Sequence, residues 1–218
     1  DLPIASAFGA AEAIGNRVFV FGGKKSKTGD DLGGGFWALD LDSDPRQWVE
    51  LAPCPGPARS KMVTAVQRSS DGETCIFLFS GSRATQNTVG DPAFEMFSDA
   101  YRYSPKANSW TRLADLPILD DPRLIQGKEK FAEQPWPINA ASAFAYGAHE
   151  ILTFSGSTGR YILDDGGKLV PAQDRPSFLN RVLRYDTHAD TWTIAGNMPI
   201  GVVTTQAVAW NGDIVITS

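Results

Sequence analysis

The chain has 218 residues, of which 42% are hydrophobic, 21% charged and 11% aromatic, the composition of a folded globular protein rather than a disordered one. Its 20 lysines and arginines face 25 acidic residues, giving a net charge of −5 without a basic block, so no nucleic-acid partner is expected. No apolar run reaches the roughly 18 residues of a membrane helix, so we expect a soluble chain with no membrane partner.

Short apolar runs that close in small residues recur along the chain. They read Val18 to Gly23, Ile76 to Gly81 and Ile151 to Gly156, and each is preceded by a tight turn and a further strand. After a variable loop, each run is followed by an alternating strand, a turn and a tryptophan, namely Trp48, Trp110 and Trp192. With 21 glycines and 14 prolines, this pattern predicts an all-β protein with many turns.

Each repeat unit is predicted to contain four antiparallel strands. The first unit has strands near 5–13, 17–23, 36–41 and 46–51, and the second has 60–68, 74–80, 98–103 and 109–113. The third has 140–146, 150–155, 179–185 and 191–195, and a fourth begins at 202–209 and 213–217. The units therefore span about 1–52, 53–116, 117–198 and a partial 199–218 of a single domain.

Units of this kind resemble kelch repeats, which form the blades of a β-propeller. The glycines fit where a strand leaves the sheet, because positive φ and little side-chain space are needed there. We interpret the tryptophans as packing between neighbouring sheets, not as a sugar-stacking set. The long loops 24–35, 82–97 and 157–178, together with the insertion 115–139, are predicted to lie on one face, where propeller function usually resides.

The repeat is expected to be incomplete. Ser218 aligns with Ser80 and Ser155, inside a strand, and three and a half blades cannot close a ring. We therefore expect a segment of a longer protein, or half of a propeller, whose partner is the remainder of the ring in the same protein or a second chain. The isolated segment is predicted to be marginally stable.

Metal, redox and nucleophile chemistry are not indicated by the sequence. His149 and His188 fall in short turns on the face opposite the long loops, which disfavours a metal site, a serine nucleophile with a histidine base, and a carbohydrate oxidase. Cys54 and Cys75 are predicted too far apart to pair. No cofactor and no metal are therefore expected.

Side chains that bind anions and hydroxyls gather at the predicted mouth. Arg59 begins the innermost strand of the second unit, which is expected to point its leading residue at the central channel. The loops add Lys24, Lys25, Lys27, Arg83, Gln86, Asn87, Arg160, Tyr161 and Arg175. For the lysines, simple solubility is the competing interpretation.

The order of features also resembles the N-acetylneuraminate epimerase family, which are six-bladed kelch propellers with sialic acid mutarotase activity. The resemblance runs through the segments at 37–40, 48–52, 57–59, 97–103, 109–110, 180–186 and 207–212 and through the hairpin ending at Ser218. It implies a substrate role for Arg59 and Asn180, a catalytic glutamate immediately after Ser218, no cofactor, and a periplasmic or exported location. Ser98 stands where the family has an asparagine, so no family role is carried over to it.

Two functional hypotheses follow. The first is a mutarotase that interconverts the anomers of N-acetylneuraminate or a related small-molecule sugar acid by acid/base ring opening, with Arg59, Asn180, Arg83 and Arg160 binding the substrate. The second is a non-catalytic kelch module that binds a glycan or a protein through its long loops. Acceleration of anomer exchange separates the two, because the second hypothesis predicts binding alone.

Overall fold

The computed structural model describes residues 1–25, 32–33, 35–84, 94–118, 135–158, 161–163, 166, 168–171 and 178–217. All regular secondary structure in these ranges is β-strand. Nowhere in them does a helix occur that could cross a membrane.

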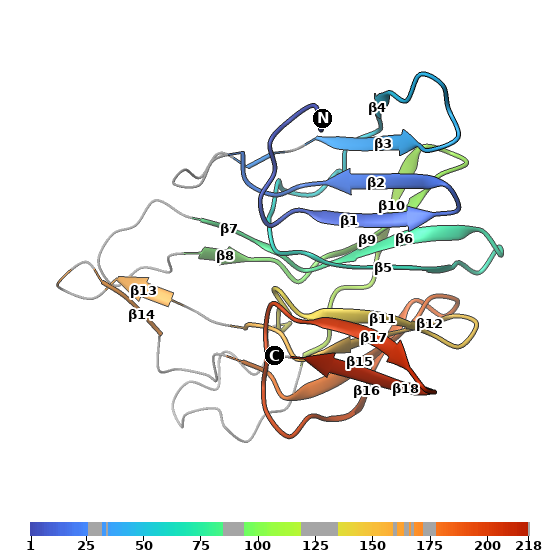
Figure 1. The fold of residues 1–218 in the computed structure, drawn as a ribbon. Helices are drawn as coiled ribbons and strands as arrows, with labels where there is room; N and C mark the ends of the chain where they lie inside the picture. The colour runs from blue at the N-terminus through green and yellow to red at the C-terminus, as the bar shows by residue number, and fades with distance from the viewer. Residues whose placement is uncertain are drawn as a thin grey trace.

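Three antiparallel four-stranded sheets and one hairpin follow one another along the chain (Figure 1). Blade one contains β1 (Ala10–Ile14), β2 (Arg17–Phe21), β3 (Phe36–Asp40) and β4 (Trp48–Glu50). Blade two contains β5 (Val63–Arg68), β6 (Thr74–Phe79), β9 (Ala100–Ser104) and β10 (Ser109–Leu113). Blade three contains β11 (Ser142–Tyr146), β12 (Glu150–Phe154), β15 (Arg181–Asp186) and β16 (Thr191–Asn197). Blade four is the hairpin of β17 (Gln206–Trp210) and β18 (Asp213–Thr217), so the predicted all-β architecture of four-stranded units is confirmed.

The first strand of each blade lies on the inside of the arrangement. β1 contacts β5, β5 contacts β11, and β11 contacts β17, whereas the later strands of each blade follow outward in chain order. This radial order is that of a partial β-propeller, and the four innermost strands surround its axis.

The hydrophobic core lies between blades rather than within one. On β6, Ile76 and Leu78 belong to the cluster shared with blade one, whereas Phe77 and Phe79 belong to the cluster shared with blade three. A strand that is covered on both faces has no polar side, which explains the unbroken apolar sequence from Cys75 to Phe79. Cys54 packs against one cluster and Cys75 lies in the other, and both are free thiols.

A tyrosine, an Asx residue and a tryptophan on the outer strands hold successive blades together. In blade two, Asn108 Oδ1 accepts hydrogen bonds from the Tyr103 hydroxyl (2.9 Å) and from the backbone N–H of Ala52 in blade one (3.0 Å). Trp110 Nε1 donates to the carbonyl of Ala52 (2.8 Å). Blade three repeats the motif on Ala114 of blade two with Tyr185, Asp190 and Trp192. Trp110 and Trp192 therefore pack between blades, as predicted.

The innermost strands begin later than the sequence pattern predicts. β1, β5, β11 and β17 start at residues 10, 63, 142 and 206, because a left-handed residue lies two positions before each strand. These residues are Phe8 (φ 58°), Lys61 (φ 56°), Ala140 (φ 56°) and Thr204 (φ 58°). A residue with positive φ cannot continue a strand, so the expectation that Arg59 opens the innermost strand of blade two is wrong.

The long loops between the second and third strands contain structure that the sequence did not reveal. β7 (Ser82–Ala84) pairs with β8 (Phe94–Met96) in blade two, and β13 (Tyr161–Leu163) pairs with β14 (Leu169–Pro171) in blade three. Figure 1 shows both hairpins projecting beyond the same end of the sheets, as expected for loops that share one face. Three-residue strands lack enough alternation to be recognised from sequence.

The Asx position of the inter-blade motif gives a stability prediction. Asn108→Ala removes the acceptor of two hydrogen bonds. It also puts an alanine, whose side chain cannot form a hydrogen bond, in a left-handed conformation with φ 46°. We therefore expect a loss of about 2–3 kcal/mol in the free energy of unfolding. Asn108→Asp should cost less than about 1 kcal/mol, because Asp190 occupies the same position in blade three. Urea unfolding monitored by tryptophan fluorescence would measure both; equal losses would contradict the assigned role.

Candidate functional site

Backbone hydrogen bonds between blades form an arc around the mouth of the channel. The N–H of Lys61 donates to the carbonyl of Phe8, that of Ala140 to Lys61, and that of Thr204 to Ala140, at 2.8, 2.8 and 2.9 Å. We call these four residues the rim. The rim lies at the same end of the sheets as the long loops, because Ala7, Ser60 and Asn139 bridge to Lys24, Ser82 and Ser157, where those loops begin.

Hydroxyl groups at the ends of the second strands reinforce the rim. Ser80 and Ser155 stand in left-handed conformations where the apolar runs close. Ser80 Oγ accepts from the N–H of Ile138 (3.1 Å), and Ser155 Oγ accepts from the N–H of Val202 (2.6 Å), each in the next blade. At the following residue, Gly156 (φ 104°), a β-carbon would lie 2.7 Å from the carbonyl oxygen of Ile138. The close approach of the neighbouring backbone therefore explains why a small residue is needed at this position.

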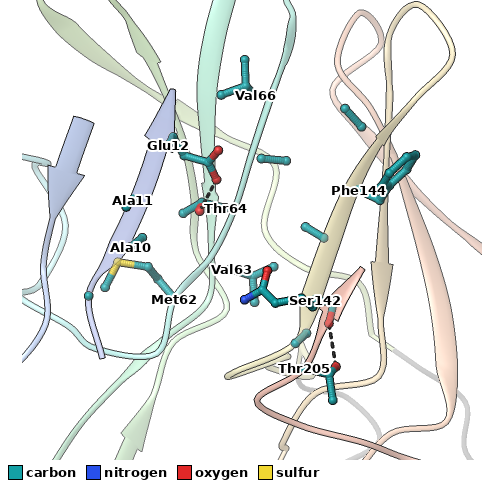
Figure 2. A pocket seen from close by; sticks show the side chains of 16 residues that line it. Ala10, Ala11, Glu12, Met62, Val63, Thr64, Val66, Ser142, Phe144 and Thr205 are labelled. Atoms are coloured by element: carbon teal, nitrogen blue, oxygen red, sulfur yellow. Dashed lines mark hydrogen bonds between the residues drawn. The ribbon is translucent and has the colours of Figure 1, made fainter. Parts of the chain in front are cut away.

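Below the rim, the innermost strands enclose a channel cavity of about 470 Å³. Its lining comes from the segments 9–12, 62–66, 141–145 and 205–206. Figure 2 shows two hydrogen-bonded pairs in it: Glu12 of β1 with Thr64 of β5, and Ser142 of β11 with Thr205 of the segment preceding β17. The cavity can therefore present hydroxyl and carboxyl groups to a ligand on the axis.

Glu12 is the one acidic residue among the described residues that line the channel cavity. Thr64 Oγ1 donates a hydrogen bond to Glu12 Oε1 (2.5 Å) (Figure 2). Burial raises the pKa of Glu12, and the bond from Thr64 offsets only part of that effect. A carboxyl group with a raised pKa that faces a cavity is suited to proton transfer.

Sequence reasoning missed Glu12, although a usable signal was present. Glu12 is a single acid flanked by Ala11 and Ala13 on a strand assigned to the inside of the ring. Small neighbours leave space around the carboxyl group, and every second side chain of an innermost strand lies on the sheet face that meets the next blade. The position of Lys61 at the rim was also missed, because the start of β5 was predicted too early.

Arg59 lies at the loop end of blade two, in a buried setting. It is 3% exposed, and its guanidinium pairs with Asp99 through two hydrogen bonds, of which Nη2 to Oδ2 measures 2.6 Å. Further bonds run from Nε to the carbonyl of Pro57 (3.0 Å) and from Nη1 to that of Ser80 (2.9 Å). Its guanidinium carbon stacks 4.6 Å from the Phe97 ring centroid. In this structure the Asp99 carboxylate therefore occupies the N–H groups of Arg59 that a substrate carboxylate would use.

Arg83 and Asn180, two further predicted substrate-binding residues, lie apart from the channel lining. Arg83 on β7 pairs with Glu95 on β8 (2.5 Å), and its guanidinium also approaches the ring of Phe97 (5.8 Å). Asn180 is partly buried and immediately precedes β15 of blade three. The structure thus brings Arg59 and Arg83 to one aromatic ring but leaves Asn180 in a different blade. The substrate roles of Arg59, Arg83 and Asn180 stay predictions. Five further residues of the predicted mouth lie outside the described residues, namely Lys27, Gln86, Asn87, Arg160 and Arg175.

The histidines lie at the opposite end of the blades from the rim. His149 stacks on His188 with ring centroids 4.7 Å apart, and His149 Nε2 lies 3.7 Å from Asp186 Oδ2. Within the described ranges, no group of three or more histidine, cysteine or acidic side chains could hold a metal ion.

Comparison with known proteins assigns the family. The sequence model described as N-acetylneuraminate epimerase matches residues 1–134, more than half of the chain. The chain belongs to the N-acetylneuraminate epimerase family. An N-acetylneuraminate epimerase of Haemophilus influenzae (strain 86-028NP) is 28% identical over 209 residues, covering 91% of this chain and 49% of the relative. One from H. influenzae (strain PittEE) is 34% identical over 113 residues, covering 52% and 26%, and one from Shigella sonnei (strain Ss046) is 26% identical over 195 residues, covering 83% and 47%.

The chain therefore spans about half the length, or less, of the curated epimerases that it matches. The partial ring seen here agrees with that ratio.

The buried ion pair of Arg59 and Asp99 gives a prediction about how stability depends on pH. Burial by itself raises the pKa of Asp99, but the hydrogen bonds and charge of Arg59 outweigh it and lower that pKa below its usual value. The pair therefore stabilises the fold above the unfolded pKa of about 4, and this contribution is lost as pH falls through the lower folded pKa. Arg59→Met leaves a buried carboxylate without its cation, so we expect a loss of about 3–5 kcal/mol at pH 7.

The sign of the pH dependence makes that prediction specific. Without Arg59, burial is the largest influence on the folded pKa of Asp99 and raises it, against smaller lowering effects of Tyr101 and Arg112. Stability should therefore fall as pH rises above about 4. Urea unfolding of Arg59→Met between pH 3 and 8, with Asp99→Asn added as a second variant that removes this dependence, would measure it. A pH profile parallel to that of the unsubstituted protein would contradict the assignment.

The Glu12 carboxyl group gives a second pH-dependent prediction. Because its folded pKa is raised, its stability penalty is absent below the unfolded pKa of about 4.3 and grows as pH rises through the folded pKa. Glu12→Gln should therefore increase the free energy of unfolding at pH 8 more than at pH 4. Thr64→Val, which removes the hydrogen bond to the carboxylate, should raise the pKa of Glu12 further, as measured by carbon-13 NMR titration.

Proposed function

We propose that the chain forms part of a sugar-acid mutarotase, which interconverts the anomers of N-acetylneuraminate or a related sugar acid. Membership in the epimerase family carries this proposal. The channel supports it, because it combines a carboxyl group of raised pKa with hydroxyl groups at the axis of the ring.

The reaction needs only proton transfer at two oxygens. A base takes the proton of the anomeric hydroxyl group, whose oxygen then forms the keto carbonyl while the bond between the anomeric carbon and the ring oxygen breaks. An acid protonates the ring oxygen as it leaves. Closure onto the other face of the carbonyl, with both proton transfers reversed, gives the opposite anomer without any oxidant or cofactor.

Glu12 is suited to be one of these two proton-transfer groups. The raised pKa favours the protonated form of the carboxyl group, which is the form that protonation of the ring oxygen requires. Thr64 fixes the orientation of the carboxyl group from the neighbouring blade (Figure 2). We propose a glutamate as the second group, as the resemblance to the family implies.

The whole catalytic unit in this proposal includes the rest of the ring. The fourth blade contributes two strands here, and its outer face exposes Val208 (50%) and Trp210 (67%). Apolar side chains on that face are suited to pack against further strands. The proposed partner is therefore the remaining part of the propeller, in the same protein or in a second chain.

Anomer exchange tests the proposed function directly. The protein at its natural length is mixed with freshly released α-anomer of N-acetylneuraminate, and proton NMR follows the approach to equilibrium; we expect faster exchange than in buffer. Glu12→Gln should slow the catalysed exchange by about a hundredfold. Glu50→Gln, on β4 at the outside of the same blade, should leave it unchanged.

Each contrary result has a distinct meaning. No acceleration by the unsubstituted protein would refute the mutarotase proposal, and binding without acceleration would favour a glycan-binding module. Unchanged exchange in Glu12→Gln would refute the role of Glu12 alone.

A further inference from the structure

The four rim residues occupy equivalent positions, but they differ in charge. Phe8, Lys61, Ala140 and Thr204 share a left-handed conformation and are linked by backbone hydrogen bonds from blade to blade. Among these four, Lys61 carries the ionisable side chain. Because Lys61 accepts one inter-blade bond and donates another, its backbone is fixed at the mouth of the channel.

A second cavity, of about 250 Å³, lies beside Lys61 on the loop side of the rim. Its walls combine apolar side chains with hydroxyl and amide groups from three blades. The lining residues that matter here are Phe94, Met96, Phe178, Ser82, Asn139 and Thr204. A sugar acid presents the same mixture of apolar ring faces and polar groups, so the cavity is chemically suited to one.

The Lys61 ammonium group has no ion-pair partner in the part of the chain that the structure describes. Nζ lies 5.6 and 5.7 Å from the ring centroids of Phe8 and Phe94, which orient the side chain without neutralising it. Burial and the nearby charge of Lys24 lower the pKa of Lys61. A partly buried cation next to a second cation favours an anionic ligand.

Asn139 adds an independent sign of a ligand in the same cavity. Its side chain is 6% exposed, and its Oδ1 has no hydrogen-bond partner in the described structure. A buried acceptor without a donor is unfavourable by about 1–3 kcal/mol. A hydroxyl or acylamido N–H group of a ligand, reached by a small shift of the side chain, would provide that donor.

We propose that Lys61 binds the carboxylate of the sugar acid in the rim cavity, an inference that rests on the proposed mutarotase function. Arg59, the cation expected from the sequence, is already paired with Asp99. Lys61 precedes Thr64, the partner of Glu12, by three residues, so their α-carbons lie at most about 11 Å apart. A carboxylate held at Lys61 therefore leaves the sugar ring within reach of the channel.

Two substitutions at one position separate charge from shape. Lys61→Met retains most of the side-chain stem against the rings but removes the charge, and Lys61→Arg retains the charge. The matched control is Lys106→Met, in the exposed turn between β9 and β10 at the far end of blade two. The ligands are N-acetylneuraminate and its methyl ester, which lacks the negative charge, with affinities measured by titration calorimetry on the protein at its natural length.

We expect Lys61→Met to weaken binding of the acid by about tenfold and to leave binding of the ester unchanged. Lys61→Arg should bind the acid within about threefold of the unsubstituted protein. In exchange kinetics, Lys61→Met should raise KM with little change in kcat, because the contact is made equally in the ground and transition states. Lys106→Met should match the unsubstituted protein in every measurement.

Unchanged acid binding in Lys61→Met would overturn the inference, and so would an equal loss for acid and ester, which would indicate shape rather than charge. If the unsubstituted protein accelerates exchange and Lys61→Met has the same KM, this inference fails and the proposed function stands. If the charge dependence of binding is found without acceleration, the proposed function fails and the carboxylate site stands. If no sugar acid binds at all, both fail.

Discussion

The backbone bond between consecutive rim residues is the constraint on which the rest of the structure depends. One left-handed residue turns the chain so that its N–H reaches the carbonyl of the preceding blade. The same turn delays the start of each innermost strand, which sets the register of the blade and the side chains that line the channel. Lys61 acquires its place at the mouth, and Glu12 its place inside, from this single repeated geometry.

Two further sets of hydrogen bonds between blades repeat at increasing distance from the axis. Hydroxyl groups of Ser80 and Ser155 bind the incoming backbone of the next blade, and the motif ending in Trp110 or Trp192 binds the preceding blade at the periphery. Apolar clusters fill the space between these polar contacts. Because each blade is covered by its neighbours, stability depends on adjacent pairs, as in other repeat proteins.

Charge is distributed differently from what residue type alone suggests. An arginine near a mouth is an obvious candidate for a carboxylate ligand, yet Arg59 lies against Phe97 and pairs with Asp99, so it connects parts of one blade. The lysine two residues later keeps its charge available at the rim. The contrast arises because a planar guanidinium matches a carboxylate of the protein with two parallel bonds, whereas a single ammonium between aromatic rings leaves its donors open.

The sequence by itself determined the all-β class, the order of the four strands in each blade, the inter-blade packing of Trp110 and Trp192 and the face on which the long loops lie. These follow from local pattern, because period-two alternation, turn residues and spacing act over a few residues. Only the tertiary structure decided that Arg59 is buried, that Glu12 meets Thr64 and that Lys61 stands at the rim. Those facts depend on contacts between residues some 40 or more positions apart in the sequence, within a blade for Arg59 and between blades for Glu12 and Lys61. They also depend on a left-handed backbone conformation that the residue type of a lysine, alanine or threonine does not indicate.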